Sequence, residues 1–122
     1  MRKFLILPLA LLACSAAADE STVILPLEAQ TCNLPSAPAR VAKDATYEDL
    51  VEAKGDISQF QADMERYRAC LDKSREDVNL TEGNEVALNE AHNYSVEMEE
   101  RVAEQFNVAV RAYKERQAEQ AE

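Results

Sequence analysis

The sequence lacks several of the residue types on which common protein functions depend. Basic residues are few, since 13 lysines and arginines stand against 23 aspartates and glutamates, which makes the formal net charge −10. Such a charge repels nucleic acid and anionic lipid surfaces, so we expect no nucleic-acid partner. Tryptophan is absent, glycine occurs twice and only 6% of the residues are aromatic. This composition favours helices with solvated outer faces.

Histidine occurs once, which limits metal and catalytic chemistry. His92 has Glu85, Asn89 and Glu99 at helical spacings around it. One imidazole with scattered carboxylates makes a poor transition-metal site, and a di-iron bundle would need Glu-x-x-His where this chain has Asn89-x-x-His92. The serines show no base and orienting group beside them of the kind that nucleophilic catalysis needs. We therefore expect no catalytic residue, no metal or cofactor, and no enzyme activity.

Long apolar runs are also missing, apart from a short one near the start of the chain. Arg2 and Lys3 precede an apolar run over 4–13. Its length of about ten residues is half of the roughly twenty that a membrane span requires. Basic residues followed by a short apolar run and small residues are typical of an export signal. We expect the chain to leave the cytoplasm, with the periplasm as its destination.

The sequence contains two possible signal-cleavage sites, and they differ in whether the exported protein is anchored to a membrane. Leu11-Leu12-Ala13-Cys14 resembles a lipobox, which would remove residues 1–13 and leave Cys14 as a lipid anchor. Alternatively, Ala16-Ala17-Ala18 is an A-x-A site, which would remove residues 1–18. The second cut would leave 104 residues with a formal charge of −12, from 11 basic and 23 acidic side chains.

Cysteine occurs three times, and an odd number in an exported protein needs an explanation. Cys14 is either acylated or discarded with the signal, which leaves Cys32 and Cys70 as the one intrachain pair. We expect them to form a disulfide, because exported proteins meet an oxidising environment. Closing a loop of nearly forty residues stabilises the folded chain by roughly 4 kcal/mol in the chain-entropy model.

Residues 19–44 form an arm, and residues 45–122 form the rest of the domain. Pro26, Pro35 and Pro38 block any long helix in the arm, which we expect to be extended. The arm carries one apolar patch over 23–25. A weak apolar line in the second half of the chain, Val96, Ala103 and Val110 at intervals of seven, is a candidate surface for this patch or for a partner helix.

Two amphipathic stripes predict two helices, over about 47–78 and about 84–116. Thr46 is the expected N-cap of the first, and Thr81 to Asn84 contain the start of the second. The first stripe has a period of 3.5 and the second a mean spacing of about 3.7. Their members, in order, are Leu50, Ala53, Ile57, Phe60, Met64, Tyr67 and Leu71, then Ala87, Ala91, Tyr94, Met98, Val102, Phe106, Ala109 and Tyr113. After the last of these no apolar residue larger than alanine follows, and we expect the helix to fray.

The two stripes match each other in an antiparallel arrangement. Residues that face each other in a hairpin have numbers with a constant sum, and Met64 with Met98 and Phe60 with Val102 both sum to 162. The midpoint falls at residue 81, inside the expected turn. We therefore predict an all-α fold: an antiparallel, coiled-coil-like αα-hairpin with a proline-containing N-terminal arm, stapled by one disulfide.

Four segments of the sequence resemble an uncharacterised family of small exported, periplasmic proteobacterial helical proteins. The segments are Pro35-Ser-Ala-Pro38, Ala45-Thr46-x-Glu48-x-Leu50-x-x-Ala53, Tyr67-x-x-Cys70-Leu71 and Phe106-Asn107-x-Ala109-Val110-Arg111-Ala112-Tyr113-Lys114. The resemblance implies a periplasmic helical hairpin and no particular activity. Leu80-Thr81 is also similar to the turn of periplasmic helical-hairpin chaperones and metal-stress sensors.

Together these features predict a non-enzymatic binding or structural component of the bacterial cell envelope that acts through helical packing surfaces. We expect a protein partner or a homodimer, because two helices alone make a thin core. Contact with a membrane is expected only through Cys14. A periplasmic chaperone or a stress or metal sensor of the helical-hairpin type is the alternative.

Overall fold

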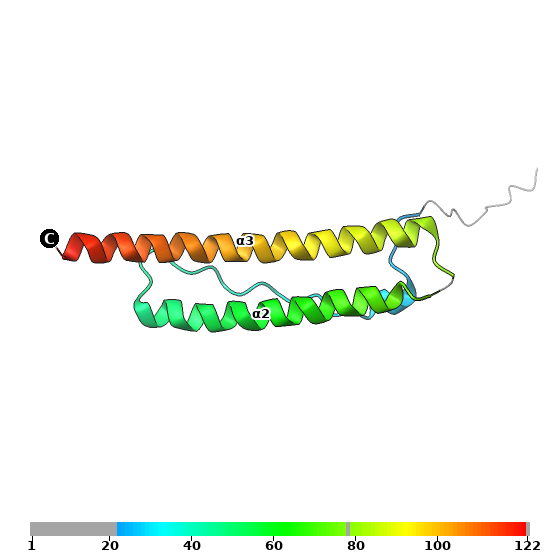
Figure 1. Cartoon of the computed structure of the whole chain (residues 1–122), viewed down its shortest axis with the longest axis horizontal. Coiled ribbons are helices and arrows are strands. Elements are labelled where there is room, and N and C mark those ends of the chain that lie inside the picture. The colour runs from blue at the N-terminus through cyan, green and yellow to red at the C-terminus, as the bar shows by residue number, and fades with distance from the viewer. Residues whose placement is uncertain (1–21, 78, 122) are drawn as a thin grey trace, which may run out of the picture.

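The computed structural model describes residues 22–77 and 79–121. They form three helices, α1 (Leu27–Gln30), α2 (Tyr47–Ser74) and α3 (Glu82–Gln120). The two long helices lie side by side and run in opposite directions, and the arm passes lengthwise along them (Figure 1). The predicted all-α hairpin with its N-terminal arm is confirmed. The expected export signal and Cys14 lie outside the described residues.

Both long helices begin at a threonine that closes a capping box. The Asp49 amide donates to Thr46 Oγ1 over 3.2 Å, and the Thr46 amide donates back to the Asp49 carboxylate over 3.0 Å. Thr81 and Asn84 exchange the same pair of bonds over 3.0 and 3.1 Å. Each box satisfies two backbone donors that a helix start leaves free. The predicted N-cap Thr46 is confirmed, and the second helix starts within the predicted Thr81 to Asn84 segment, with Thr81 as its N-cap.

The long helices end at different places from those predicted. α2 stops at Ser74, where the side-chain hydroxyl donates to the Leu71 carbonyl over 2.5 Å and so competes with the helical backbone bond. α3 continues to Gln120, so the fraying expected after Tyr113 is wrong. The reason is Arg116, whose guanidinium donates to the carbonyls of Lys43 and Ala45 and ties the last turns of α3 to the arm.

The core lies along the seam between the long helices. Every member of the predicted α2 stripe is buried or half-buried there. On α3 the prediction was wrong at Tyr94, which is 49% exposed, whereas Leu88 and Ser95 are fully buried. The buried α3 line Leu88, Ser95, Val102 and Ala109 repeats every seven residues, which is the coiled-coil period and not the looser spacing expected.

Ser95 can occupy a core position because its hydroxyl is fully bonded. It donates to the His92 carbonyl over 2.6 Å and accepts from Arg68 Nη1 over 3.3 Å. A buried hydroxyl with both partners avoids the cost of an unsatisfied polar group. Arg68 with Ser95 also sums to 163, so this contact agrees with the register predicted from the stripes.

The arm packs onto the hairpin as a third layer and is not wholly extended. Its α1 turn places Ala29, 1% exposed, against the core beside Leu25. Near the other end of the arm, Val41 packs against the cluster that contains Ala109, as does Val110 of the Val96, Ala103 and Val110 line. Val23 and Ile24 of the patch over 23–25 are exposed and Leu25 packs against the other cluster, so the patch does not share the cluster of Val110. Instead, Asn84 Nδ2 at the start of α3 donates to the Ile24 carbonyl over 2.7 Å.

Candidate functional site

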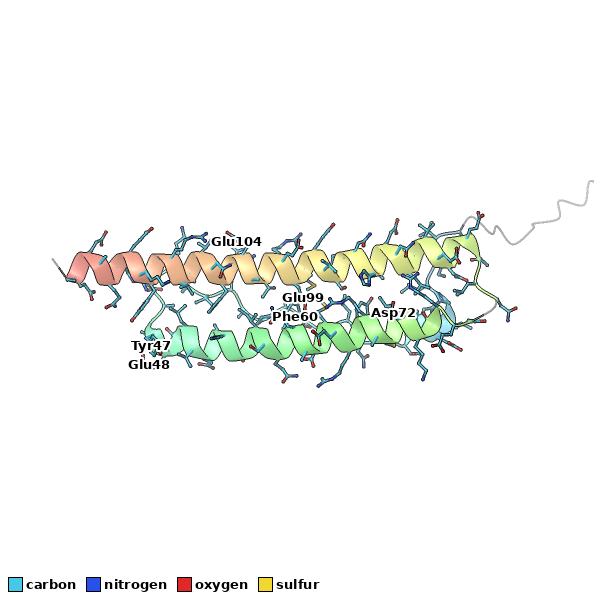
Figure 2. The ribbon with its side chains drawn as sticks, viewed as in Figure 1. Tyr47, Glu48, Phe60, Asp72, Glu99 and Glu104 are labelled. Carbon is cyan, nitrogen blue, oxygen red and sulfur yellow. A yellow bond between two sulfur atoms is a disulfide. The ribbon has the colours of Figure 1, made fainter. Side chains whose placement is uncertain are left out.

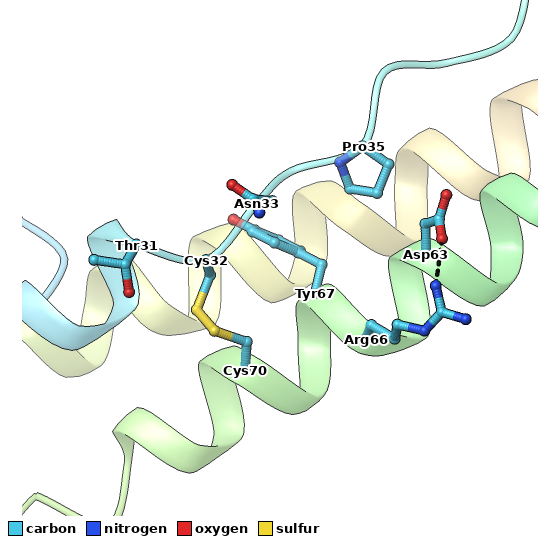
Figure 3. Close-up of a pocket in the computed structure, with 8 residues that line it drawn as sticks. All are labelled: Thr31, Cys32, Asn33, Pro35, Asp63, Arg66, Tyr67 and Cys70. Atoms are coloured by element: carbon cyan, nitrogen blue, oxygen red, sulfur yellow. Dashed lines mark hydrogen bonds and ion pairs between the residues drawn. A yellow bond between two sulfur atoms is a disulfide. The ribbon is translucent and has the colours of Figure 1, made fainter.

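A groove runs between the arm and α2 in the described chain, and we call it the arm groove. One part of it has a volume of about 400 Å³ (Figure 3). A second part, of about 560 Å³, shares Thr31 and Cys70 with the first and extends toward Leu27 and Lys73. The first part is lined by Thr31, Cys32, Asn33 and Pro35 of the arm and by Asp63, Arg66, Tyr67 and Cys70 of α2. The lining of the two parts together runs from Asp63 to Ser74, so the groove follows about three turns of α2.

The disulfide predicted from the cysteine count is the bond that crosses this groove. Cys32 lies just beyond α1 and Cys70 lies near the end of α2, with 5.8 Å between their Cα atoms. This separation lies within the usual range for a disulfide. Both residues are half-buried, and both line the groove. The two sequence-predicted site residues are thus brought together, and their bond joins the arm covalently to the hairpin.

Tyr67 lies in the groove one turn before Cys70, with Asn33 and Pro35 of the arm across from it (Figure 3). Tyr67 is 8% exposed, and this burial raises the pKa of its phenol above the ordinary value. The phenol therefore stays protonated at neutral pH, when it can donate and accept hydrogen bonds. Sequence analysis assigned Tyr67 to the core stripe and did not identify its place in a groove.

Charged side chains of both signs surround the groove. Arg66 and Asp63 form an ion pair of 2.7 Å on the surface of α2, where solvent weakens such pairs. Lys73 and Glu28 line the second part. An open groove with an aromatic ring, a disulfide and mixed charges is suited to bind an extended polypeptide segment.

A polar cluster joins the long helices on their facing sides. Arg68 of α2 pairs with Glu99 of α3 over 3.1 Å, and the two side chains are only 17% and 19% exposed. The same guanidinium donates to the buried Ser95. Figure 2 shows Glu99 and Phe60 close to the seam between the helices. Sequence analysis missed this cluster, although the register sum could have paired Arg68 with Ser95.

Two of the three residues that surround His92 in the sequence bond to arginines of α2. Glu99 pairs with Arg68, and Asn89 Oδ1 accepts from Arg75 Nη2 over 2.9 Å. Within residues 22–77 and 79–121, no group of three or more histidine, cysteine, aspartate or glutamate side chains is arranged to hold a metal ion. These contacts explain Asn89 and Glu99 as residues that join α3 to α2.

Comparisons with known proteins add no family assignment. Family models, curated proteins and solved structures all give no match to this chain. The resemblance stated from the sequence therefore stays an expectation. Among the described helices, none combines the length and apolar character needed to cross a bilayer.

Proposed function

We propose that this chain is a non-enzymatic binding or structural component of the bacterial cell envelope that acts through its helical packing surfaces. The observation that carries this proposal is an exposed apolar line on α3. Val86, Tyr94 and Val108 are 43%, 49% and 41% exposed. At 100° per residue these three positions fall within about 80° of one another, so they share one side of the helix.

This shared side is suited to a second helix. Exposed large apolar residues are common singly on protein surfaces, but a line on one helix side is the pattern by which helices recognise each other. The pattern supports a homodimer or a helical protein partner. Glu97 and Arg101 lie between Tyr94 and Val108 on the chain, and such charges set the pairing of helices rather than its strength.

The envelope location is part of the proposal, and two features support it. A disulfide between Cys32 and Cys70 fits an oxidising compartment, and the N-terminal segment is typical of an export signal. We propose the periplasm, with Cys14 as a lipid anchor in the lipoprotein form. The intact mass of protein from its native host distinguishes the forms, because cleavage at either site and acylation each change it.

Light scattering on purified protein, lacking residues 1–18, tests the function. We expect a mass that rises to that of a dimer with concentration, and we expect Tyr94→Ser with Val108→Ser to keep it a monomer. Val51→Ser on α2, where the side chain is 54% exposed, is the matched control and should still dimerise. A dimer that survives the double substitution would exclude the α3 line as the interface.

The alternative, a hairpin chaperone, predicts a different result in the same preparation. A protein that stays a monomer and prevents a denatured client enzyme from aggregating would favour the chaperone and contradict the structural role. The arm groove is the feature that would hold such a client. A monomer inactive toward clients directs attention to a separate partner, which co-purification from the native host would identify.

A further inference from the structure

We propose that reduction of the Cys32–Cys70 disulfide is a switch that frees the arm around α1 from α2 and opens the arm groove, while α2 and α3 stay paired. The proposal is independent of the envelope function above. It depends on where the disulfide lies, on how little else holds this part of the arm, and on the core that α2 and α3 form between them.

The disulfide is placed where an external thiol can reach it. Cys32 lines the first part of the arm groove, and Cys70 lines both parts. Both residues are half-buried, in contrast with the fully buried Met64 and Leu71 of the α2 stripe. Exchange requires a thiolate to approach a sulfur, so a disulfide in an open groove is open to attack.

The reductant is a dithiol, and the exchange balances with it alone. One thiolate of the dithiol attacks Cys32 Sγ, and the bonding electron pair leaves on Cys70 Sγ as a thiolate. The second thiol of the reductant, as its thiolate, then attacks the mixed disulfide and releases Cys32 Sγ. The dithiol becomes a disulfide, and the two cysteines gain two electrons and the two protons that the dithiol gives up.

The charges near Cys70 favour this direction of attack. Arg66 precedes Cys70 by four residues and Lys73 follows it by three, so both lie one helical turn away, and each lines a part of the groove that Cys70 also lines. Cations near a cysteine stabilise its thiolate and make it the better leaving group. Asp63 and Glu28 oppose this effect, and Asp63 is paired with Arg66.

Little besides the disulfide holds this part of the arm. α1 is a single turn of four residues, which is too short to persist alone. Besides Cys32, the apolar residues of this part of the arm that pack against the core are the buried Ala29 and the half-buried Leu25, and Asn84 bonds to the Ile24 carbonyl. An alanine and part of a leucine bury little apolar surface against the entropy of ordering the segment.

The long helices keep their own core when the arm leaves. Met64 and Leu71 of α2 and Leu88 of α3 are fully buried and belong to one cluster, to which the arm contributes Ala29. The Arg68–Glu99 pair also joins α2 to α3 without any residue of the arm. The far end of the arm remains held through Arg116. Reduction should therefore open one end of the molecule and leave the hairpin intact.

Amide hydrogen exchange on the purified chain, with and without excess dithiothreitol, tests the switch. In the oxidised protein the amides of Ala29 and Cys32 donate to the carbonyls of Pro26 and Ala29. On reduction we expect exchange over 27–35 to accelerate at least about tenfold, with little change over 60–71 and 88–102. Equal exchange over 27–35 in both states would overturn the proposal, as would equal acceleration in the long helices.

A second readout follows Tyr67, which the arm covers. Titrating the phenols by absorbance, with Tyr67→Phe subtracted, should show the pKa of Tyr67 nearer its ordinary value in the reduced chain. Cys32→Ser with Cys70→Ser should reproduce the reduced state and show no further response to dithiothreitol. An unchanged Tyr67 titration in this variant would also contradict the release of the arm.

Discussion

The ion pair between Arg68 and Glu99 provides the sharpest test of how the two long helices are held in register. It is the one ion pair between α2 and α3 within the described parts of the chain, and its atoms lie 3.1 Å apart. Replacing Glu99 by Gln keeps the size of the side chain and removes its charge. Replacing Arg68 by Gln, alone and together with Glu99→Gln, completes a double-mutant cycle.

The magnitude follows from distance and burial. Two unit charges 3.1 Å apart attract by about 5 kcal/mol at an effective dielectric constant of about 20, before desolvation is subtracted. Exposed pairs retain about 0 to 1 kcal/mol, and breaking a fully buried pair costs about 3 to 5 kcal/mol. Side-chain exposures of 17% and 19% place this pair between the limits. We expect a coupling energy of about 1 to 2 kcal/mol.

Urea unfolding of the four proteins at low salt, followed by circular dichroism, measures this coupling. Arg66 and Asp63 supply the matched control, because their atoms lie even closer, at 2.7 Å, but the side chains are exposed by 74% and 37% and the pair lies within one helix. We expect a coupling of about 0.5 kcal/mol or less there. A coupling at Arg68–Glu99 no larger than the control would refute the role assigned to the pair.

Four further outcomes follow from the structure. Leu88→Ala should lower the free energy of unfolding by about 2 to 5 kcal/mol, whereas Tyr94→Ala should change it by about 0.5 kcal/mol or less; equal effects in urea unfolding would contradict the core assignment. Gly55→Ala should raise the melting temperature, with about 1 kcal/mol of added stability, because a Cβ there meets no atom within 4 Å. Arg116→Ala should cost about 1 to 2 kcal/mol and increase amide exchange at the end of α3, and unchanged exchange would argue against the tie to the arm. Burial raises the pKa of Tyr67, so above pH 10 the unfolded chain loses this proton while the folded chain keeps it. The free energy of unfolding therefore has its full value below pH 10 and falls above it, and Tyr67→Phe should weaken that fall in unfolding experiments across this pH range.

Several features of the fold depend on local pattern, and sequence reasoning predicted them. The heptad spacing of α2, the threonine caps and the constant register sum all express interactions between residues near in the chain or repeated along it. The pairing of Cys32 with Cys70 followed from counting cysteines. The end of α3 was predicted wrongly. Arg116 stabilises it through bonds to backbone carbonyls that are over seventy residues away in the chain, and no local pattern indicates them.

The sequence by itself determined the helical hairpin and its register, because apolar periodicity and helix capping depend on residues close together in the chain. It also determined the disulfide, because only two cysteines were left to pair. Only the tertiary structure decided which polar residues are buried between α2 and α3. Ser95 is buried and Tyr94 is exposed because Arg68 and the His92 carbonyl satisfy the serine hydroxyl, a fact that apolarity along one helix cannot reveal. It also decided that the arm folds back over α2, since that path depends on contacts summed over distant segments, and the arm groove exists as a consequence.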